Sequence, residues 1–279
     1  MARSISTPKL VATHAALCAA CAVVLYPVLW VIKMALSPSQ SFSMSASPLP
    51  TEVSASNFIH LMTMNGGLFW RQLFNSIAVS LATTAIGVIL ACTAAYAFSR
   101  FRFPGRKLGM AGFLITQMFP GVVMAIPLYI LLDELELLNS LTGLVLVYST
   151  SSLPFCVWML KGYFDTIPKD LEEAALMDGA SQWVIFTQIV LPLAKPAIVV
   201  TALFSFMTAW NEFILAATFL NDESLMTLPV VLQRFVGDYS TQWGYFAAGA
   251  ILVSLPVMAL FFKLQKYLIG GLTAGAVKG

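Results

Sequence analysis

Charged residues are scarce in this sequence. Only 10% of its 279 residues are charged and 59% are hydrophobic, whereas about a quarter of the residues in an average soluble domain are charged. The chain holds only two histidines, His14 and His60, and four cysteines. This composition excludes an ordinary soluble domain. It also leaves no basic domain of the kind that binds nucleic acid, so we expect no nucleic-acid partner.

Residue sets for catalysis and metal binding are also missing. The two histidines are isolated, and no nucleophile, base and orienting group can be assembled from the sequence. We therefore expect no catalytic residue and no metal site. The sequence has no G-x-x-x-x-G-K-[ST] loop to hold nucleotide phosphates, so ATP that drives this chain must be hydrolysed by another chain. The four cysteines lie in apolar segments, where we expect them to pack as small hydrophobic residues.

The sequence consists largely of long runs of apolar residues. Each is close to the roughly 20 residues that an α-helix needs to cross a bilayer, and a lipid-exposed span must satisfy its own backbone hydrogen bonds, which favours helices. We therefore predict an all-α, polytopic membrane protein whose six transmembrane helices form a single domain over residues 1–279. The predicted spans are Ala15–Lys33, Leu73–Phe98, Leu108–Leu132, Leu141–Leu160, Ala197–Leu220 and Tyr245–Leu268.

The distribution of lysine and arginine orients these spans. With the N-terminus in the cytoplasm, only Lys33, Arg71 and Arg234 of the 15 cations lie outside. This asymmetry follows the positive-inside rule, so we expect both termini in the cytoplasm. The predicted loops are external at about residues 36–72 and 221–244 and cytoplasmic at about residues 161–195, with a cytoplasmic tail at residues 269–279.

Two predicted spans contain residues that do not suit a lipid-exposed helix. The third span has Pro120-Gly121 and Pro127, so we expect two losses of backbone hydrogen bonds and a kink or unwound turn near the middle of the membrane. Such backbone is tolerated where it lines a cavity, and simple kinking is an equal alternative. In the fifth span, Glu212 is either functional or paired structurally near the outer boundary. The candidate pathway-lining residues are Gln117, Pro120, Gly121, Trp210, Asn211 and Glu212.

The long cytoplasmic loop has the pattern of two short helices joined by a turn. Pro168 suits the start of a helix, the acidic residues after it suit the positive end of the helix dipole, and Gly179 suits the left-handed position that ends it. Ser181 suits the N-cap of a second helix. From these patterns alone, an interfacial loop with a solvated charged face is an equal alternative. The side of the second helix predicted to face the membrane carries Trp183, Phe186, Ile189 and Val190.

The same loop carries a longer motif. Glu173-Ala174-Ala175, followed by Gly179 and Ile189-x-Leu191-Pro192, resembles the cytoplasmic EAA motif of ABC importer permease subunits. The wider sequence resembles the binding-protein-dependent sugar permeases, and in particular the smaller permease subunits of maltose/maltodextrin importers. That similarity lies in Arg100–Gly105, Gln117–Pro120, Trp210–Phe213, Leu228–Pro229 and the C-terminal tail.

The resemblance implies a fold, a location and partners. These are the type I importer permease fold in the bacterial cytoplasmic (inner) membrane, a second and larger permease subunit, a homodimer of ATPase subunits, and an extracytoplasmic solute-binding protein. ATP and Mg²⁺ would bind to the ATPase subunits, and this chain would hold no cofactor. The substrate would be maltose or maltodextrin, or else another sugar or a glycerol phosphate. A self-sufficient secondary transporter or channel is the alternative from a different class, although such proteins usually carry internal repeats and intramembrane ion sites.

The resemblance also implies roles for two segments. The cytoplasmic loop would enter a cleft on an ATPase subunit, where Glu173 would meet a cation because an unpaired buried carboxylate is costly. We expect the tail to be too rich in glycine for a stable helix, and the resemblance places it between the ATPase subunits. The implied coupling residues are Glu172, Glu173, Ala174, Ala175, Asp178, Gly179 and Ala180, and the implied tail contacts are Gly271, Leu272, Thr273, Ala274 and Gly275.

Overall fold

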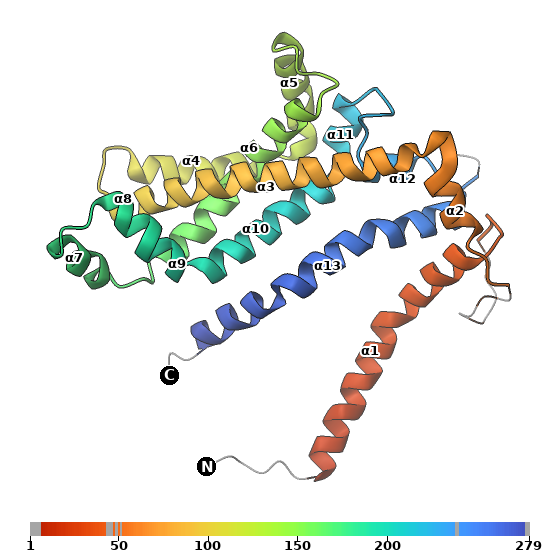
Figure 1. Cartoon of the computed structure of the whole chain (residues 1–279), viewed down its shortest axis with the longest axis horizontal. Coiled ribbons are helices and arrows are strands. Elements are labelled where there is room, and N and C mark those ends of the chain that lie inside the picture. The colour runs from red at the N-terminus through yellow and green to blue at the C-terminus, as the bar shows by residue number, and fades with distance from the viewer. Residues whose placement is uncertain (1–6, 43–46, 48–49, 51, 238–239, 277–279) are drawn as a thin grey trace. The chain divides into compact units, whose positions relative to one another are not determined.

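The computed structural model of this chain describes residues 7–276, apart from residues 43–46, 48, 49, 51, 238 and 239, and it describes side chains as far as Tyr267. The described part is helical, and its one β feature is an antiparallel bridge between Val236 and Thr241. The all-α prediction is therefore confirmed (Figure 1). Residues 1–70 with 231–255 form one compact unit, and residues 71–230 with 256–279 form a second.

The helices follow one another in this order: α1 (Thr7–Leu36), α2 (Ser56–Thr63), η1 (Met64–Gly66), α3 (Leu68–Arg100), α4 (Arg106–Met118), α5 (Gly121–Glu134), α6 (Leu141–Phe164), α7 (Asp170–Met177), α8 (Gln182–Val184), η2 (Ile185–Val190), α9 (Leu191–Leu193), α10 (Lys195–Trp210), α11 (Ile214–Phe219), α12 (Leu228–Gln233) and α13 (Trp243–Ala276).

Four helices in the described residues are long and apolar enough to cross a membrane: α1, α3, α6 and the part of α13 up to Tyr267. Two bent pairs raise the number to six if each counts as one span. These pairs are α4 with α5, bent by 102°, and the segment Gln182–Leu193 with α10, bent by 77°. The six-span prediction agrees with this upper count.

The predicted interruption of the third span is confirmed at Phe119-Pro120. Phe119 is extended, with φ −79° and ψ 126°, because the residue before a proline is biased away from the α region. Pro120 then occupies the N-cap position of α5. Pro127 lies inside α5, where its missing N–H removes the second backbone hydrogen bond without ending the helix.

The fifth predicted span is shorter than expected. Its helix, α10, ends at Trp210, and a new short helix begins at Ile214. The Glu212 carboxylate accepts hydrogen bonds from the backbone N–H groups of Leu215 (2.8 Å) and Ala216 (3.1 Å). These bonds satisfy free donors at the start of α11, so Glu212 favours a new helix where hydropathy alone predicted a continuous one.

Within the first unit, a buried amide orders the chain after α1. The Asn57 side chain donates to the carbonyl oxygens of Ala35 (3.0 Å) and Ser37 (2.7 Å). On the same short helix, α2, the ring of His60 stacks on that of Tyr245 with ring centroids 4.2 Å apart. Unpaired polar groups are costly to bury, so Asn57 fixes α2 against the end of α1.

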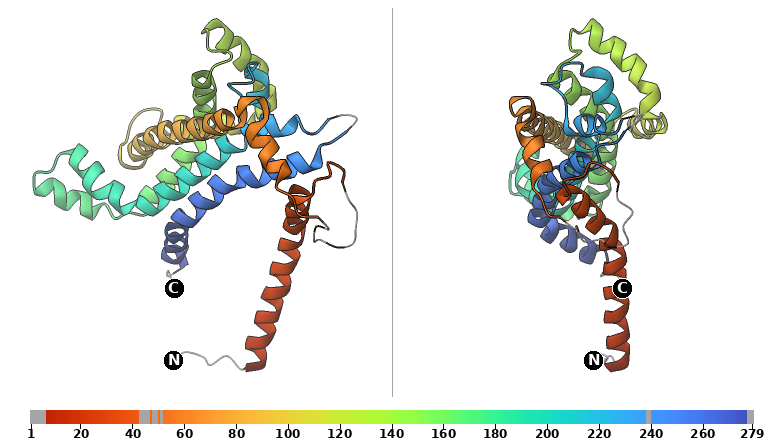
Figure 2. Two further views of the ribbon diagram at one scale, coloured as in Figure 1. Left: turned by 45° about the vertical axis from the view of Figure 1, so that its right-hand side comes forward. Right: turned by 90° about the vertical axis from the view of Figure 1, so that its right-hand side faces the viewer.

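Within the second unit, α3 and α6 form the core together with η2. Buried residues in this core include the small pair Ala91 and Ala95, which let the helices approach closely, and both Cys92 and Cys156. The packing role predicted for these two cysteines is confirmed, whereas Cys18 and Cys21 are exposed on α1. Figures 1 and 2 show α7 at one end of this unit, and α5 and α11 toward the other.

Candidate functional site at the α7 hairpin

The α7 hairpin, defined here as residues 165–194, folds as the sequence predicts. Asp170, Glu172 and Glu173 lie in the first turn of α7, where negative charge complements the helix dipole. Gly179 has φ +85°, and the N–H of Ala180 returns to the carbonyl of Ala175 at 2.9 Å. This left-handed exit ends the helix and turns the chain back.

The second limb of the hairpin begins where the sequence predicts, but it packs differently from the prediction. Ser181 is the N-cap, as predicted, and its hydroxyl accepts from the N–H of Val184 at 3.4 Å. The limb then contains a π-helical turn, η2. The prediction that this limb turns Phe186 and Val190 toward the membrane is wrong, because both are buried in the protein core, where the rings of Phe186 and Tyr96 lie 4.8 Å apart. Trp183 remains 67% exposed.

The inner face of α7 is held by a buried ion pair. Arg100 Nε lies 2.5 Å from Glu172 Oε1, and the two side chains are only 7% and 10% exposed. The hydroxyl of Tyr96 donates to Glu172 Oε2 at 3.1 Å, and the Arg100 guanidinium also donates to the carbonyl of Ile167 at 3.1 Å. The carboxylate is therefore satisfied on both oxygens, which is what a buried charge requires.

A second polar link joins the root of the hairpin to the same end of α3. Ser99 Oγ donates to Asp165 Oδ1 at 2.6 Å, and Lys161 Nζ lies 2.5 Å from Asp165 Oδ2. Partial burial opposes ionisation of this carboxyl, but the hydrogen bonds from Lys161 and Ser99 outweigh it and hold the pKa of Asp165 below its usual range. The two links together fix the hairpin to α3 and α6.

The outer face of α7 is free of such links. Glu173, Ala174 and Asp178 are exposed, and Met177 is 88% exposed. Among the described residues, the Glu173 side chain has no ion pair or hydrogen bond. An exposed methionine and alanine beside an unpaired carboxylate form a surface suited to a partner that offers a cation and an apolar contact.

The coupling residues predicted from sequence thus divide into two groups. Glu172 faces inward and pairs with Arg100, so within this predicted set it lies on the side of α7 that is held by the protein. Ala175 and Ala180 are half-buried against the core. The residues that remain available to a partner are Glu173, Ala174, Asp178 and Gly179.

The candidate pathway residues near Glu212 are occupied by structural contacts. Besides capping α11, Glu212 accepts a hydrogen bond from the hydroxyl of Tyr148 at 2.5 Å. Trp210 is 2% exposed and stacks on Phe206. Asn211 is exposed, and its amide donates to the carbonyl of Met207 at 2.9 Å. These contacts favour the structural alternative for Glu212 and Trp210.

The candidates near the bend of the third span are more accessible. Gln117 is exposed, and its amide donates to the carbonyl of Ser151 on α6 at 3.1 Å. Pro120 and Gly121 are exposed where α4 gives way to α5. This group lies at the junction of α4 and α5, and the Glu212 group lies at the junction of α10 and α11. The described hydrogen bonds, ion pairs and ring contacts join no member of one group to the other.

The C-terminal tail differs from expectation. Helix α13 continues through Gly271–Gly275 to Ala276, so the prediction that these glycines prevent a helix is wrong. A helix already nucleated by a long apolar segment propagates at low cost per residue, even across residues of weak propensity. Residues 277–279 lie outside the described part of the chain.

A family model described as the inner membrane component of binding-protein-dependent transport systems matches residues 49–272 of this chain. The chain belongs to this family. The match includes the α7 hairpin and the helices that hold it, so the ion-paired hairpin belongs to an inner membrane component of a transport system.

Several named permeases are similar to this inner membrane component. The trehalose transport system permease protein SugB of Mycobacterium tuberculosis is 36% identical over 257 residues, covering 91% of this chain and 93% of its own. The galactooligosaccharides transport system permease protein GanQ of Bacillus subtilis is 39% identical over 259 residues, covering 92% and 91%. The maltose/maltodextrin transport system permease protein MalG of Yersinia pestis is 36% identical over 290 residues, covering 97% and 94%.

Solved structures share the fold of this inner membrane component. A chain from the crystal structure of a bacterial ABC transporter involved in the import of the acidic polysaccharide alginate matches with a TM-score of 0.79 at 23% identity, over 95% of this chain and 99% of that one. A chain of the MetNI methionine ABC transporter matches with a TM-score of 0.61 at 16% identity, over 73% and 95%. The predicted permease fold is therefore confirmed.

Sequence reasoning missed the residues that anchor the hairpin in this inner membrane component. The sequence indicated Arg100 as a cytoplasmic cation and as part of the segment that resembles the sugar permeases, but not as a partner of Glu172, and it did not indicate Tyr96. The signal was their spacing, because residues four apart lie on one face of a helix. The partner of that face, Glu172, is 72 residues away in sequence, so only the folded structure brings the three together.

Proposed function

We propose that this chain is the permease subunit of an ATP-driven sugar importer in the bacterial inner membrane, and that its substrate is maltose or a maltodextrin. The names of its relatives support the sugar class, and four of these proteins are named for maltose or maltodextrin transport. Other relatives name trehalose, galactooligosaccharides and diacetylchitobiose. These three sugars are the direct competitors of maltose in the proposal.

The proposed complex contains a second, larger permease subunit, two identical ATPase subunits and an extracytoplasmic solute-binding protein. The ATPase subunits bind ATP and Mg²⁺, and this chain supplies no catalytic group. One structure with the same fold is a transporter in complex with its periplasmic protein, which supports a partner of that kind. Positive-inside asymmetry supports cytoplasmic termini and a cytoplasmic α7 hairpin.

The observation that carries this proposal is the division of α7 into an anchored face and a free face. Glu173, Ala174 and Asp178 are exposed on the tip, while Glu172 is tied to α3 through Arg100. The free face docks in a cleft on an ATPase subunit, and a cation there pairs with Glu173. The anchored face then passes the movement of the ATPase to α3 and α6 and drives alternating access.

Two further roles complete the proposal. The helical tail, through Gly271, Leu272, Thr273, Ala274 and Gly275, contacts the ATPase pair and affects assembly and hydrolysis. This chain forms half of the translocation pathway. The accessible candidates for lining that pathway are Gln117, Pro120, Gly121 and Asn211. Trp210 and Glu212 support the wall of the pathway through their packing and capping contacts.

Purification of the full-length tagged chain in a mild detergent tests the class. The account predicts that a second permease and an ATPase subunit copurify with it, and that the complex takes up labelled maltose faster than labelled trehalose or galactooligosaccharide. A lone chain that transports on its own contradicts the importer assignment. A complex that prefers another sugar overturns only the choice of maltose.

A further inference from the structure

A hollow lies in the second unit between α4, the loop that precedes it, and α6. Its volume is about 950 Å³, and residues from Arg102 to Leu114 form one side while Trp158 and Lys161 form the other. The hollow lies apart from the outer face of α7 and has no place in the coupling mechanism proposed above. A second hollow, lined by residues of α10 and α13, has a volume of only about 320 Å³.

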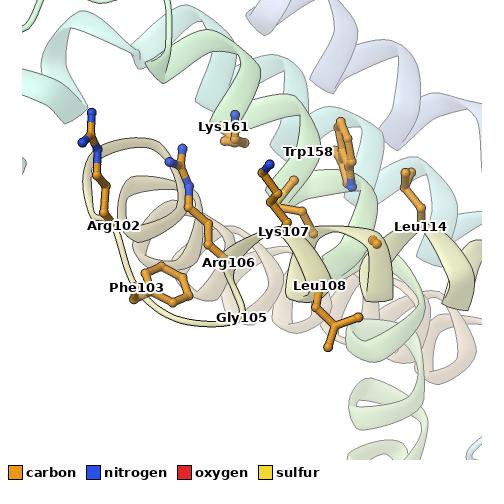
Figure 3. A pocket seen from close by; sticks show the side chains of 11 residues that line it. Arg102, Phe103, Gly105, Arg106, Lys107, Leu108, Leu114, Trp158 and Lys161 are labelled. Carbon is orange, nitrogen blue, oxygen red and sulfur yellow. The ribbon is translucent and has the colours of Figure 1, made fainter.

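The polar part of the hollow carries one sign of charge. Its charged lining residues are Arg102, Arg106, Lys107 and Lys161, and no carboxylate lines it. Figure 3 shows the nitrogen ends of the first three pointing the same way, toward the side on which Lys161 lies. An anion that entered would therefore meet several donors at once.

Most of this positive charge is not used by the protein itself. Within the described residues, Arg102 and Lys107 make no ion pair or side-chain hydrogen bond. Arg106 Nε donates to the carbonyl oxygen of Phe98 at 2.8 Å, and the two terminal nitrogens of Arg106 remain available to a ligand. Lys161 is neutralised by Asp165. Helix α4 also begins here without a side-chain cap, so its free N–H groups and dipole add to the positive potential.

The remaining walls are apolar. Leu114 is 48% exposed and Trp158 is 39% exposed, and Met110 and Ala111 also line the hollow. Both α4 and α6 belong to candidate membrane-spanning segments. A soluble phosphate would bind the cations but would leave the apolar walls uncovered. A phospholipid has a phosphate for the cations and alkyl chains that can cover the apolar walls.

We propose that this hollow binds an anionic phospholipid of the cytoplasmic leaflet. The phosphate and any further anionic headgroup contact Arg102, Arg106 and Lys107, and the first part of an acyl chain lies along Ala111, Leu114 and Trp158. Charge complementarity commits the site to an anionic lipid over a zwitterionic one, and positive-inside orientation places the cations at the leaflet where anionic lipids supply the surface charge. A tryptophan at this level is typical of the membrane interface.

The bound lipid would also steady the loop next to the hairpin anchor. Arg102 lies only two residues after Arg100, which holds Glu172. A headgroup that fixes Arg102 therefore restricts the end of α3 on which α7 depends. The binding proposal itself does not depend on which sugar is carried.

The test uses the full-length chain, purified with its partner subunits, and two pairs of charge substitutions. Arg102→Gln with Lys107→Gln removes two cations from the hollow. Lys263→Gln with Lys266→Gln is the matched control, because these residues are exposed on α13 outside the hollow and carry the same charge. Native mass spectrometry counts the lipids retained from the membrane, and a titration of delipidated protein with phosphatidylglycerol in detergent micelles measures affinity.

The proposal predicts that phosphatidylglycerol binds the first variant at least about tenfold more weakly and binds the control variant as it binds the unaltered protein. Ala111→Trp keeps every cation and fills an exposed position on the apolar wall, so it should weaken binding as well. Equal losses in both charge variants, unchanged binding by Ala111→Trp, equal binding of phosphatidylcholine, or competition by millimolar inorganic phosphate would each overturn the proposal.

Discussion

Glu172 and Glu173 are neighbours in sequence but lie on different faces of α7. Glu172 is buried and lies 2.5 Å from Arg100, whereas Glu173 is exposed on the outer face of α7. In a helix, consecutive side chains are separated by about 100°, so adjacent residues can serve different surfaces. One carboxylate therefore anchors the hairpin and the next remains available to a partner.

The ion pair between Arg100 and Glu172 should contribute strongly to stability. Removing one partner leaves an uncompensated buried charge, which costs about 3–5 kcal/mol. We expect Arg100→Ala and Glu172→Ala each to lower the thermal unfolding temperature of the purified chain, and the double variant to lose much less than the sum of the two. Additive losses would show that the two side chains do not act as a pair.

Gly179 should matter through its backbone conformation alone. It has φ +85°, and a Cβ atom placed there meets nothing within 4 Å. A β-branched residue is strained at this φ by about 1–2 kcal/mol, whereas asparagine tolerates it. Gly179→Val should therefore reduce coupled sugar uptake while Gly179→Asn preserves it, with membrane abundance measured for both. Equal uptake by the two variants would exclude a role for the left-handed turn.

The hydrogen bonds and ion pair of Asp165 should make the stability of the hairpin depend on pH in the acid range. Because the folded-state pKa of Asp165 is lowered, its contribution is present above the ordinary aspartate pKa of about 3.9 and is lost as the pH falls through the lower folded-state value. Asp165→Asn should destabilise the chain at pH 7. On acidification, the stability of this variant should fall less than that of the unaltered protein. Thermal unfolding measured from pH 7 to pH 3 checks this, and parallel curves would contradict it.

The helix break at Glu212 should be structural. Glu212→Ala removes an acceptor for two backbone donors and for the Tyr148 hydroxyl, at a cost of about 1–2 kcal/mol. We expect a lower unfolding temperature and little change in the KM for sugar, and Tyr148→Phe should reproduce a smaller part of the effect. A large rise in KM at unchanged stability would instead favour direct contact with substrate.

The parts of the fold predicted from sequence are those that depend on local patterns. Apolar runs indicated the spanning helices, Pro120 marked the bend, and Gly179 and Ser181 marked the turn and cap of the hairpin, because each effect acts within a few residues. The break after Trp210 was missed, since it depends on a carboxylate that folds back onto the next helix. The helical tail was missed because glycine content was weighed without the helix that precedes it.

The candidate site was predicted less completely, for the same physical reason. The family resemblance implied the same coupling role for Glu172 and Glu173, because both belong to the cytoplasmic motif. Their separation depends on Arg100 and Tyr96, which come from a helix some 70 residues earlier. No periodicity within the loop itself contains that information.

We assign Glu173 to the docking face of α7 and Glu172 to the anchor, so substitutions at the two positions should have different effects. We expect Glu173→Ala to leave the unfolding temperature unchanged and to abolish most ATPase copurification, because its side chain makes no ion pair or hydrogen bond within the described residues. Glu134→Ala is the matched control, since Glu134 is an exposed acidic residue at the end of α5.

Copurification of the ATPase subunit, measured beside thermal unfolding for Glu173→Ala, Glu172→Ala and Glu134→Ala, tests this claim most directly. We expect Glu173→Ala to lose the ATPase while staying fully stable, Glu172→Ala to lose stability, and Glu134→Ala to keep both properties. A stable Glu173→Ala variant that retains the ATPase as well as the unaltered protein does would contradict it.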